Sequence, residues 1–248
     1  MEADLLRRAL DLSRRAEKYA VCTNSGFLTP AEQQELRILT ARERNMTMVL
    51  HGGAADCERS VAFFLPSWQE PEDLDPSGAI AALRITAAFG SPGHRDYLGA
   101  ILGLGIRREA LGDIRMAEEH AYLLCLENIS DYLVQNLEKV GRCGVKAARI
   151  PLNEVPPLVR QYKSVTFTVQ SLRLDAVCGG MFGLSRTSAN AQILQGNVSV
   201  NYLPCLKPDA PLHPGDVMSL RGSGKGTLLE PGGTSRKGRQ FIRVDIWK

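Results

Sequence analysis

The chain has 248 residues, of which 44% are apolar and 23% charged, a composition typical of a soluble globular protein. No apolar run reaches the ~20 residues of a membrane-spanning helix, and the first residues lack the apolar core of a signal peptide. The six cysteines include no Cys-x-x-Cys pair, which argues against a zinc site and against a disulfide framework. We therefore expect a cytoplasmic protein with reduced cysteines, no metal and no cofactor.

The net charge of +3 is unevenly distributed along the chain. Residues 164–248 carry ten Lys and Arg against five Asp and Glu, whereas residues 1–163 carry 20 against 22. This asymmetry indicates a polyanionic partner for the C-terminal third. Because the excess is modest, we expect such binding to be sensitive to salt.

The N-terminal segment, residues 1–45, has the pattern of two helices. Residues 3–21 show the apolar spacing of an amphipathic helix, which Asn24-Ser25-Gly26 is expected to break. Thr29-Pro30-Ala31-Glu32 has the form of a capping box with proline at the first helical position. A second helix is therefore predicted to run to about Arg44.

The middle region, residues 46–150, has a more regular pattern. After a short strand at 46–50 and a proline-rich loop at 66–78, the expected elements are a strand at 82–87, a helix at 91–104, strands at 112–116 and 121–126, a helix at 128–140 and a strand at 145–150. This βαββαβ order matches the ferredoxin-like topology of RNA-recognition modules, which bind RNA through aromatics on the open sheet face. Tyr122 is the only aromatic residue of the two central strands, so RNA binding here is predicted from context rather than from a motif.

The proline-containing segment 151–165 is expected to be a stiff linker, and residues 166–248 a small α+β domain. Gly183 should end the first helix of this domain, and Ser185 is a natural N-cap for a second helix that Gly196 closes. Strand patterns follow at 198–202, 216–221 and 241–247.

The basic residues of this domain each have two interpretations, one structural and one as a contact to an anion. Arg186 in the first helical turn opposes the helix dipole, which is unfavourable unless an anion lies nearby. Arg173 precedes the first helix, and with Asp175 it could form only a surface ion pair of ~0–1 kcal/mol. Lys225 between two glycines is either a loop tip or part of a phosphate-binding nest, and the basic turn at 234–239 is either a solvated hairpin or a phosphate clamp.

Several motifs together point to a known family. The helix–helix–strand signature resembles the S4-type RNA-binding domain; it consists of Arg173-Leu174-Asp175, Leu184-Ser185-Arg186, Ala189, Ile193, Gly196, Val198, Val200-Asn201 and Pro214-Gly215-Asp216-Val217. The whole chain resembles the YlmH family, through His51-Gly52-Gly53, Glu58-Arg59, His94–Gly99, Leu104-Gly105-Ile106, Gly112-Asp113-Ile114, Asn136-Leu137, Val140-Gly141-Arg142, Ser171–Val177 and Arg221–Lys225. The order and number of these blocks make the match specific.

The resemblance implies a monomeric RNA-binding protein of the large ribosomal subunit, with ribosomal RNA and tRNA as partners and no membrane or small-molecule cofactor. Family members are linked to the rescue of stalled subunits that carry peptidyl-tRNA, and were earlier linked to cell division. The residues expected to contact RNA are Arg173, Ser185, Arg186, Asn190, Asn201, Arg221, Lys225, Arg236, Lys237 and Arg239. A second contact is expected from His94, Arg95, Arg107 and Arg108.

Two further classes of function are alternatives to RNA binding alone. Pseudouridine synthases carry a similar domain and a catalytic Arg-Leu-Asp, but the Thr-Ser pair that should follow is absent after Asp175. Gly222–Gly226 lacks the first glycine and the Ser or Thr of an ATP-binding P-loop. We therefore expect a non-enzymatic protein with no catalytic residue; the alternatives are an RNA-modifying enzyme and a protein scaffold in cell division.

Overall fold

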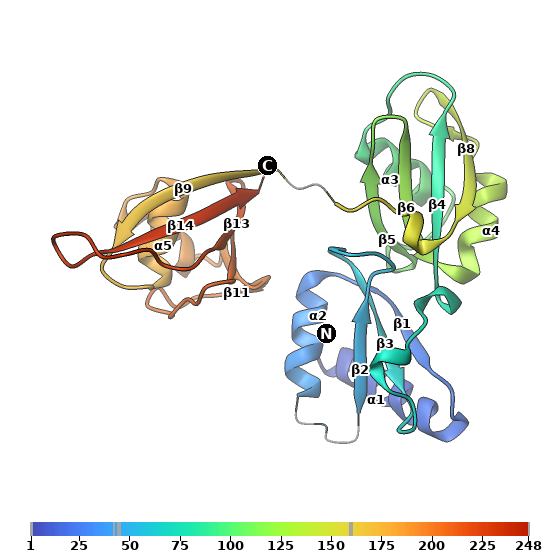
Figure 1. The fold of residues 1–248 in the computed structure, drawn as a ribbon, viewed down its shortest axis with the longest axis horizontal. Helices are drawn as coiled ribbons and strands as arrows, with labels where there is room; N and C mark the ends of the chain where they lie inside the picture. Colours follow the sequence, from blue (N-terminus) through green and yellow to red (C-terminus); the bar gives the residue numbers. More distant parts are fainter. Residues whose placement is uncertain (1, 42, 44–45, 159–160, 248) are drawn as a thin grey trace. The chain divides into compact units, whose positions relative to one another are not determined.

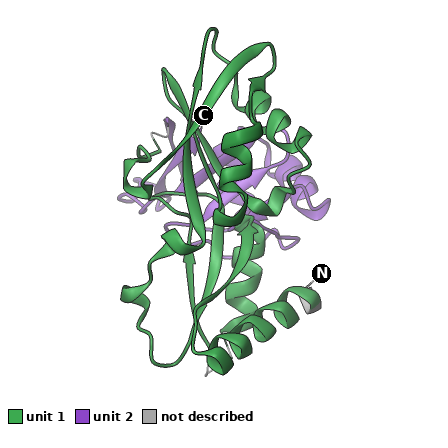
Figure 2. Cartoon of the chain, turned by 90° about the vertical axis from the view of Figure 1, so that its right-hand side faces the viewer, with its two compact units in different colours: residues 1–158 green, residues 159–248 purple. Residues whose placement is uncertain are grey.

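The computed structural model describes residues 2–41, 43, 46–158 and 161–247, which form the mixed α+β arrangement of Figure 1. The chain divides into two compact units, residues 1–158 and 159–248 (Figure 2). The division falls inside the segment 151–165 that was expected to be a linker. Within the described ranges, none of the helices has the length and apolar character needed to cross a bilayer.

The first part of unit 1 is a three-stranded sheet with two helices. Its elements are α1 (Glu2–Tyr19), β1 (Thr23–Leu28), α2 (Pro30–Thr40), β2 (Thr47–His51) and β3 (Ser60–Leu65), and the strands lie in the antiparallel order β1-β3-β2. The capping box is confirmed, because the Thr29 hydroxyl accepts from the Glu32 N–H at 3.3 Å and the Glu32 carboxylate accepts from the Thr29 N–H at 2.7 Å. Arg44, where α2 was expected to end, lies outside the described residues.

This part is not purely helical, because the segment Asn24-Ser25-Gly26 belongs to strand β1 and does not form a simple break. Only Phe27 and Leu28 of β1 are buried, so its own strand pattern is weak. Pairing with β3, in which all six residues are buried, makes this segment extended. The boundary expected between residues 45 and 46 therefore falls between elements that share one sheet-and-helix layer.

The second part of unit 1 has the ferredoxin-like arrangement. Its elements are β4 (Ile80–Ala87), α3 (His94–Gly103), β5 (Leu111–Met116), β6 (His120–Leu126), α4 (Glu127–Asn136), β7 (Lys139–Val140) and β8 (Cys143–Ile150), and the sheet order is β5-β6-β4-β8-β7. The predicted α+β class and βαββαβ order are confirmed. The second helix ends at Asn136 and not at residue 140, because Leu137 leaves the helical conformation and Val140 pairs with Cys143 as strand β7.

Two kinds of contact join the sheets of unit 1. Phe27 and Phe63 from the first sheet share a buried cluster with Ile80 and Leu124 from the second. Arg59, which is 8% exposed, adds a polar link: its guanidinium donates to the carbonyl oxygens of Leu111 at 2.8 Å, Phe27 at 2.7 Å and Arg108 at 3.3 Å. The Asp113 carboxylate accepts from the backbone N–H groups of Glu58 at 2.7 Å and Arg59 at 3.0 Å.

Unit 2 packs two helices on a six-stranded antiparallel sheet. Its elements are β9 (Tyr162–Val169), α5 (Leu174–Phe182), α6 (Arg186–Leu194), β10 (Val198–Val200), β11 (Leu203–Pro204), β12 (Val217–Leu220), β13 (Gly224–Leu228) and β14 (Gln240–Trp247), and the order is β11-β10-β12-β13-β14-β9. The expected helix signals are confirmed: Gly183 and Gly196 have φ of 67° and 74°, and the Ser185 hydroxyl accepts from the Ser188 N–H at 3.1 Å.

Strand β9 was not expected, since residues 162–165 were assigned to the linker. It pairs with β14 over its whole length, from Tyr162 opposite Trp247 to Val169 opposite Gln240. The helix α5 packs close to it: a Cβ on Gly180 would come within 2.2 Å of the Phe167 ring. Glycine destabilises a helix interior, but it is required at position 180 because no side chain fits there between α5 and β9.

Candidate nucleic-acid interface

Two arginines from successive helices converge on one carboxylate in unit 2. Arg173, the N-cap residue of α5, donates through Nε and Nη2 to the two Asp175 oxygens, both at 3.1 Å. Arg186, the first residue of α6, donates through Nε at 3.3 Å and Nη2 at 3.2 Å to Asp175 Oδ2. Asp175 is 1% exposed, whereas the two arginine side chains are 40% and 70% exposed. The carboxylate is therefore buried beneath two solvent-facing cations.

This geometry bears on the interpretations of Arg186 and Arg173 that the sequence left open. Arg186 does have a counter-ion near the start of α6, and that ion is Asp175 of the protein itself. Its unfavourable position relative to the helix dipole is thus compensated internally, and alone it does not require an external anion. The Arg173–Asp175 pair differs from a simple surface ion pair, because its carboxylate is buried and shared. One negative charge faces two positive ones.

A third cation lies at the same end of the sheet. Arg173, Arg186 and Arg239 line a hollow of about 350 Å³, together with Thr168, Gly180 and other residues of β9 and α5. Arg239 is held there because its guanidinium donates to the Thr168 carbonyl at 2.6 Å, across the β9–β14 pair. Asp175 also lines this hollow, and Asp209 lies near enough to Arg173 to help raise the pKa of its guanidinium, after the larger effect of the Asp175 hydrogen bond. The positive charge of the hollow exceeds its negative charge.

The Asp175 carboxyl should make stability depend on pH. Burial alone would raise its pKa, but the hydrogen bonds from Arg173 and Arg186 outweigh burial and lower it. A lowered folded-state pKa stabilises unit 2 above the ordinary Asp value of about 3.9, and this contribution is lost as pH falls through the folded-state pKa. We expect Asp175→Asn to cost about 1–2 kcal/mol at neutral pH, discounted because the arginines are exposed.

The corresponding measurement compares the unfolding temperature of unit 2 in wild type and Asp175→Asn from about pH 6 to about pH 3. The unfolding temperature of wild type should exceed that of Asp175→Asn by a smaller amount as the pH falls. Glu230→Gln, which alters an exposed carboxyl of the same unit, is the control. A difference that stays constant over this range would contradict the assignment.

The other predicted contacts of unit 2 divide between the two ends of the sheet. Arg236 and Lys237 are exposed in the turn closed by Ser235 and Arg239, at the end that carries the hollow. In Figure 1 the loop between β13 and β14 projects beyond this end of the β9–β14 pair. Arg221 lies in the β12–β13 turn, at the opposite end, roughly 30 Å along the strands. The register of β13 and β14 therefore separates two basic groups that are close in the sequence.

Lys225 lies in strand β13, opposite Ser219, and therefore not at a loop tip or in a nest. Its Nζ sits 4.3 Å from the centroid of the Trp247 ring, which in turn donates through Nε1 to Thr227 at 3.1 Å. The stem of this lysine is half-buried on the sheet. A contact of Lys225 with RNA stays a prediction, at the end of the sheet that carries Arg221.

The two predicted asparagines differ in how the fold holds them. Asn201 has a φ of 48°, donates to Asp216 at 2.8 Å and accepts from the Val217 N–H at 3.0 Å. Its side chain therefore holds the turn after β10. Asn190, in α6, is half-buried, and its Oδ1 has no hydrogen-bond partner among the described residues. Asn190 and Asn201 stay predicted contacts, with different freedom to reach a ligand.

The predicted second contact in unit 1 does not form one patch. His94 and Arg95 are exposed at the start of α3, while Arg107 and Arg108 follow its C-terminal end, about 15 Å away along a ten-residue helix. Arg107 pairs with Glu109 at 3.4 Å, and the Arg108 guanidinium donates to the carbonyl oxygens of Leu111 and Gly112. Of the four side chains, those of His94, Arg95 and Arg107 are exposed, whereas that of Arg108 is held by backbone carbonyl groups.

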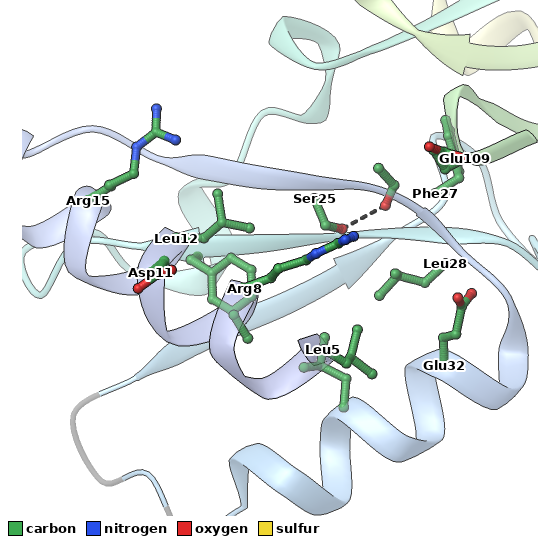
Figure 3. Close-up of a pocket in the computed structure, with 14 residues that line it drawn as sticks. Leu5, Arg8, Asp11, Leu12, Arg15, Ser25, Phe27, Leu28, Glu32 and Glu109 are labelled. Atoms are coloured by element: carbon green, nitrogen blue, oxygen red, sulfur yellow. Dashed lines mark hydrogen bonds between the residues drawn. The ribbon is translucent and has the colours of Figure 1, made fainter. Parts of the chain in front are cut away.

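Another hollow, of about 550 Å³, lies between α1, β1 and α2 (Figure 3). Its floor is apolar, from Leu5, Leu12, Phe27, Leu28, Leu36 and Phe64, and its rim carries both signs of charge. Arg8, which reaches over it, also pairs with Asp4 at 3.0 Å. This hollow therefore lacks the excess of cations that phosphate groups would favour.

Comparisons with known proteins place these features in context. A family model described as "Putative RNA-binding domain in YlmH" matches residues 71–154, which include the ferredoxin-like sheet. The chain is 29% identical over 247 residues to the ribosome-associated protein quality control protein P2 of Bacillus subtilis, an alignment that covers 100% of this chain and 96% of that protein. The solved structure of the cell division protein ylmH from Streptococcus pneumoniae matches with a TM-score of 0.54 and 21% identity, over 62% of this chain and 93% of that one, which supports the fold.

Proposed function

Since its resemblance to the YlmH family is confirmed by the family model that matches residues 71–154, and a relative named for ribosome-associated quality control aligns with the whole chain, we propose that this protein is a non-enzymatic, ribosome-associated RNA-binding protein. Its ligand is ribosomal RNA of the large subunit, and its role is the rescue of stalled subunits that carry peptidyl-tRNA. The full-length relative in Bacillus subtilis is named for ribosome-associated protein quality control, which favours this role over others.

The observation that carries the proposal is the convergence of Arg173, Arg186 and Arg239 on one hollow. Asp175 binds the Nε and Nη2 groups of both Arg173 and Arg186, so it sets the orientation of their planar forks. Within the described residues, neither Nη1 group donates a hydrogen bond to the protein. The two guanidinium groups are already oriented, and their remaining N–H donors can bind the phosphate oxygens of an RNA backbone. Little side-chain entropy is lost on binding because the arginines are held in place beforehand.

Binding would proceed in two stages. The positive excess of residues 164–248 steers the RNA to unit 2, because long-range attraction raises the rate of encounter. The arginines at the hollow then contact phosphates at fixed spacing, which selects folded RNA by shape more than by base sequence. Arg236 and Lys237 lie at the same end of the sheet and extend this surface.

The structure of the Arg-Leu-Asp segment argues against a pseudouridine-synthase-like activity. Asp175 is buried in the first turn of α5 and is hydrogen-bonded by two arginines. Its lowered pKa keeps it ionised, but its oxygens are already occupied and covered. If incubation with ribosomal RNA produced a changed nucleoside by mass spectrometry, the non-enzymatic proposal would be wrong.

Crosslinking in cells, followed by sequencing of the attached RNA, tests the proposal directly. The expected result is enrichment of large-subunit ribosomal RNA, together with tRNA. A scaffold in cell division would instead retain its partners after nuclease treatment and in high salt, whereas RNA-dependent association should fall steeply with salt. Recovery of proteins alone under those conditions would favour the scaffold.

A further inference from the structure

The ferredoxin-like sheet of unit 1 has one face that is only partly covered. Helices α3 and α4 pack on the opposite face (Figure 1). On the partly covered face, Ile80, Ala82 and Leu124 are buried against the first sheet. Further along β4 the burial alternates, with Leu83 and Ile85 buried and Arg84 and Thr86 exposed. Beyond Ala82 this face is therefore open along β4, whereas its β5 side remains covered.

Strand register places a specific set of side chains on this part of the face. Tyr122 of β6 lies opposite both Arg84 of β4 and Arg115 of β5, and Arg84 lies opposite Ala148 of β8. Directly opposed residues of antiparallel strands share a face, so Tyr122 stands between two arginines. In the next row, Thr86 lies opposite His120 on one side and Lys146 on the other.

The aromatic groups of the two rows are held in place. The His120 and Tyr122 rings meet edge to face, with centroids 6.2 Å apart, and the Thr86 hydroxyl lies 3.1 Å from His120 Nδ1. Arg115, only 3% exposed, is anchored below by the carbonyl oxygens of Ala55 and Pro156. Tyr122 also packs against the buried cluster that contains Leu124, so its ring is held in place and less entropy is lost when a ligand stacks on it.

Cations border these rings. A hollow of about 630 Å³ lies beside them and is lined by Arg84, Thr86, Gly144, Lys146, Ala148 and the acidic Glu138. The loop that follows β4 contains Phe89, whose side chain is 62% exposed. The same loop continues to the start of α3, where His94 and Arg95 are exposed. Glu118 and Glu119 lie in the β5–β6 turn at the margin. Because these acids offset part of the charge, the ring surfaces rather than net charge would supply most of the affinity.

We propose that Tyr122, His120, Arg84 and Lys146 form a second RNA site, which binds two or three unpaired bases of a single-stranded segment. Bases stack on the rings, and Arg84 and Lys146 meet the adjoining phosphates. A double helix would not bind here, because its bases are already stacked on one another. This proposal rests on the proposed RNA-binding function, and it specifies that unit 1 binds single-stranded RNA.

The test titrates the full chain with a fluorescein-labelled eight-nucleotide oligouridine and, separately, with a blunt RNA duplex, using fluorescence anisotropy. Tyr122→Ala should weaken oligouridine binding about tenfold, whereas Tyr122→Phe should retain it, because phenylalanine keeps the ring. Tyr132→Ala, which alters an exposed tyrosine on helix α4, is the matched control. The exposed pair Arg84→Ala and Lys146→Ala should lower the salt dependence by roughly one unit for each residue.

The experiment distinguishes this site from the one in unit 2. Arg173→Ala with Arg186→Ala should weaken binding to a structured ribosomal RNA fragment and leave Tyr122-dependent oligouridine binding intact. If oligouridine binding survives both Tyr122→Ala and the Arg84/Lys146 pair, or if the duplex competes equally, the single-strand site is overturned while the proposed function stands. If Tyr122→Ala abolishes oligouridine binding but the structured fragment never binds, the single-strand site stands and the proposed role of unit 2 falls.

Discussion

Replacing Arg173 and Arg186 together by alanine is expected to weaken binding to large-subunit ribosomal RNA about ten- to a hundredfold near physiological salt. Each guanidinium presents an oriented fork at the hollow, and Asp175 neutralises only one of the two charges. The slope of log affinity against log salt should therefore fall by about two units. Filter binding or anisotropy over a salt series gives both quantities.

The double variant leaves Asp175 buried without its partners, so loss of folding must be separated from loss of contact. Arg173→Lys with Arg186→Lys keeps both charges but removes the planar fork, and it should bind with intermediate affinity. Arg239 lines the same hollow but does not bind Asp175, so Arg239→Ala leaves the Asp175 hydrogen bonds untouched. Arg7→Ala with Arg14→Ala removes two exposed charges from α1 as a control of equal charge. Unchanged affinity in a folded Arg173/Arg186 variant and in Arg239→Ala would contradict the assignment of this face.

Arg59→Ala is expected to destabilise unit 1 by about 3 kcal/mol, the largest effect on stability that we predict. The substitution removes a buried guanidinium and leaves the carbonyl oxygens of Phe27 and Leu111 without their donor at the junction of the two sheets. Hydrogen exchange followed by mass spectrometry can measure this locally: amides of β1 and β5 should exchange about a hundredfold faster, while those of residues 162–247 stay unchanged.

Two further variants test the cause of this effect. Arg59→Lys keeps the charge but cannot donate to several carbonyl groups from a fixed plane, so it should recover only part of the stability. Arg107→Ala, an exposed arginine paired with Glu109, should change exchange very little. If Arg59→Ala left exchange in β1 and β5 at the wild-type rate, the guanidinium would not hold the sheets together.

Features with a local cause could be predicted from the sequence. The Thr29–Glu32 capping box, the Ser185 N-cap and the glycine ends at Gly183 and Gly196 all depend on backbone groups within a few residues. The βαββαβ order likewise followed from apolar periodicity. The sequence does not predict strand β1, because its extended conformation depends on pairing with buried β3, and it does not predict all of β9, because the partner strand β14 is far along the chain.

The sequence by itself determined which residue types could serve as RNA contacts and where the helices that carry Arg173 and Arg186 begin. Only the tertiary structure decided that both arginines share the buried Asp175, and that Arg239 joins them while Arg221 lies at the other end of the sheet. The reason is that side-chain proximity in unit 2 depends on strand register between distant segments. Spacing along the chain sets the local backbone geometry, but pairing of β9 with β14 sets which charges meet.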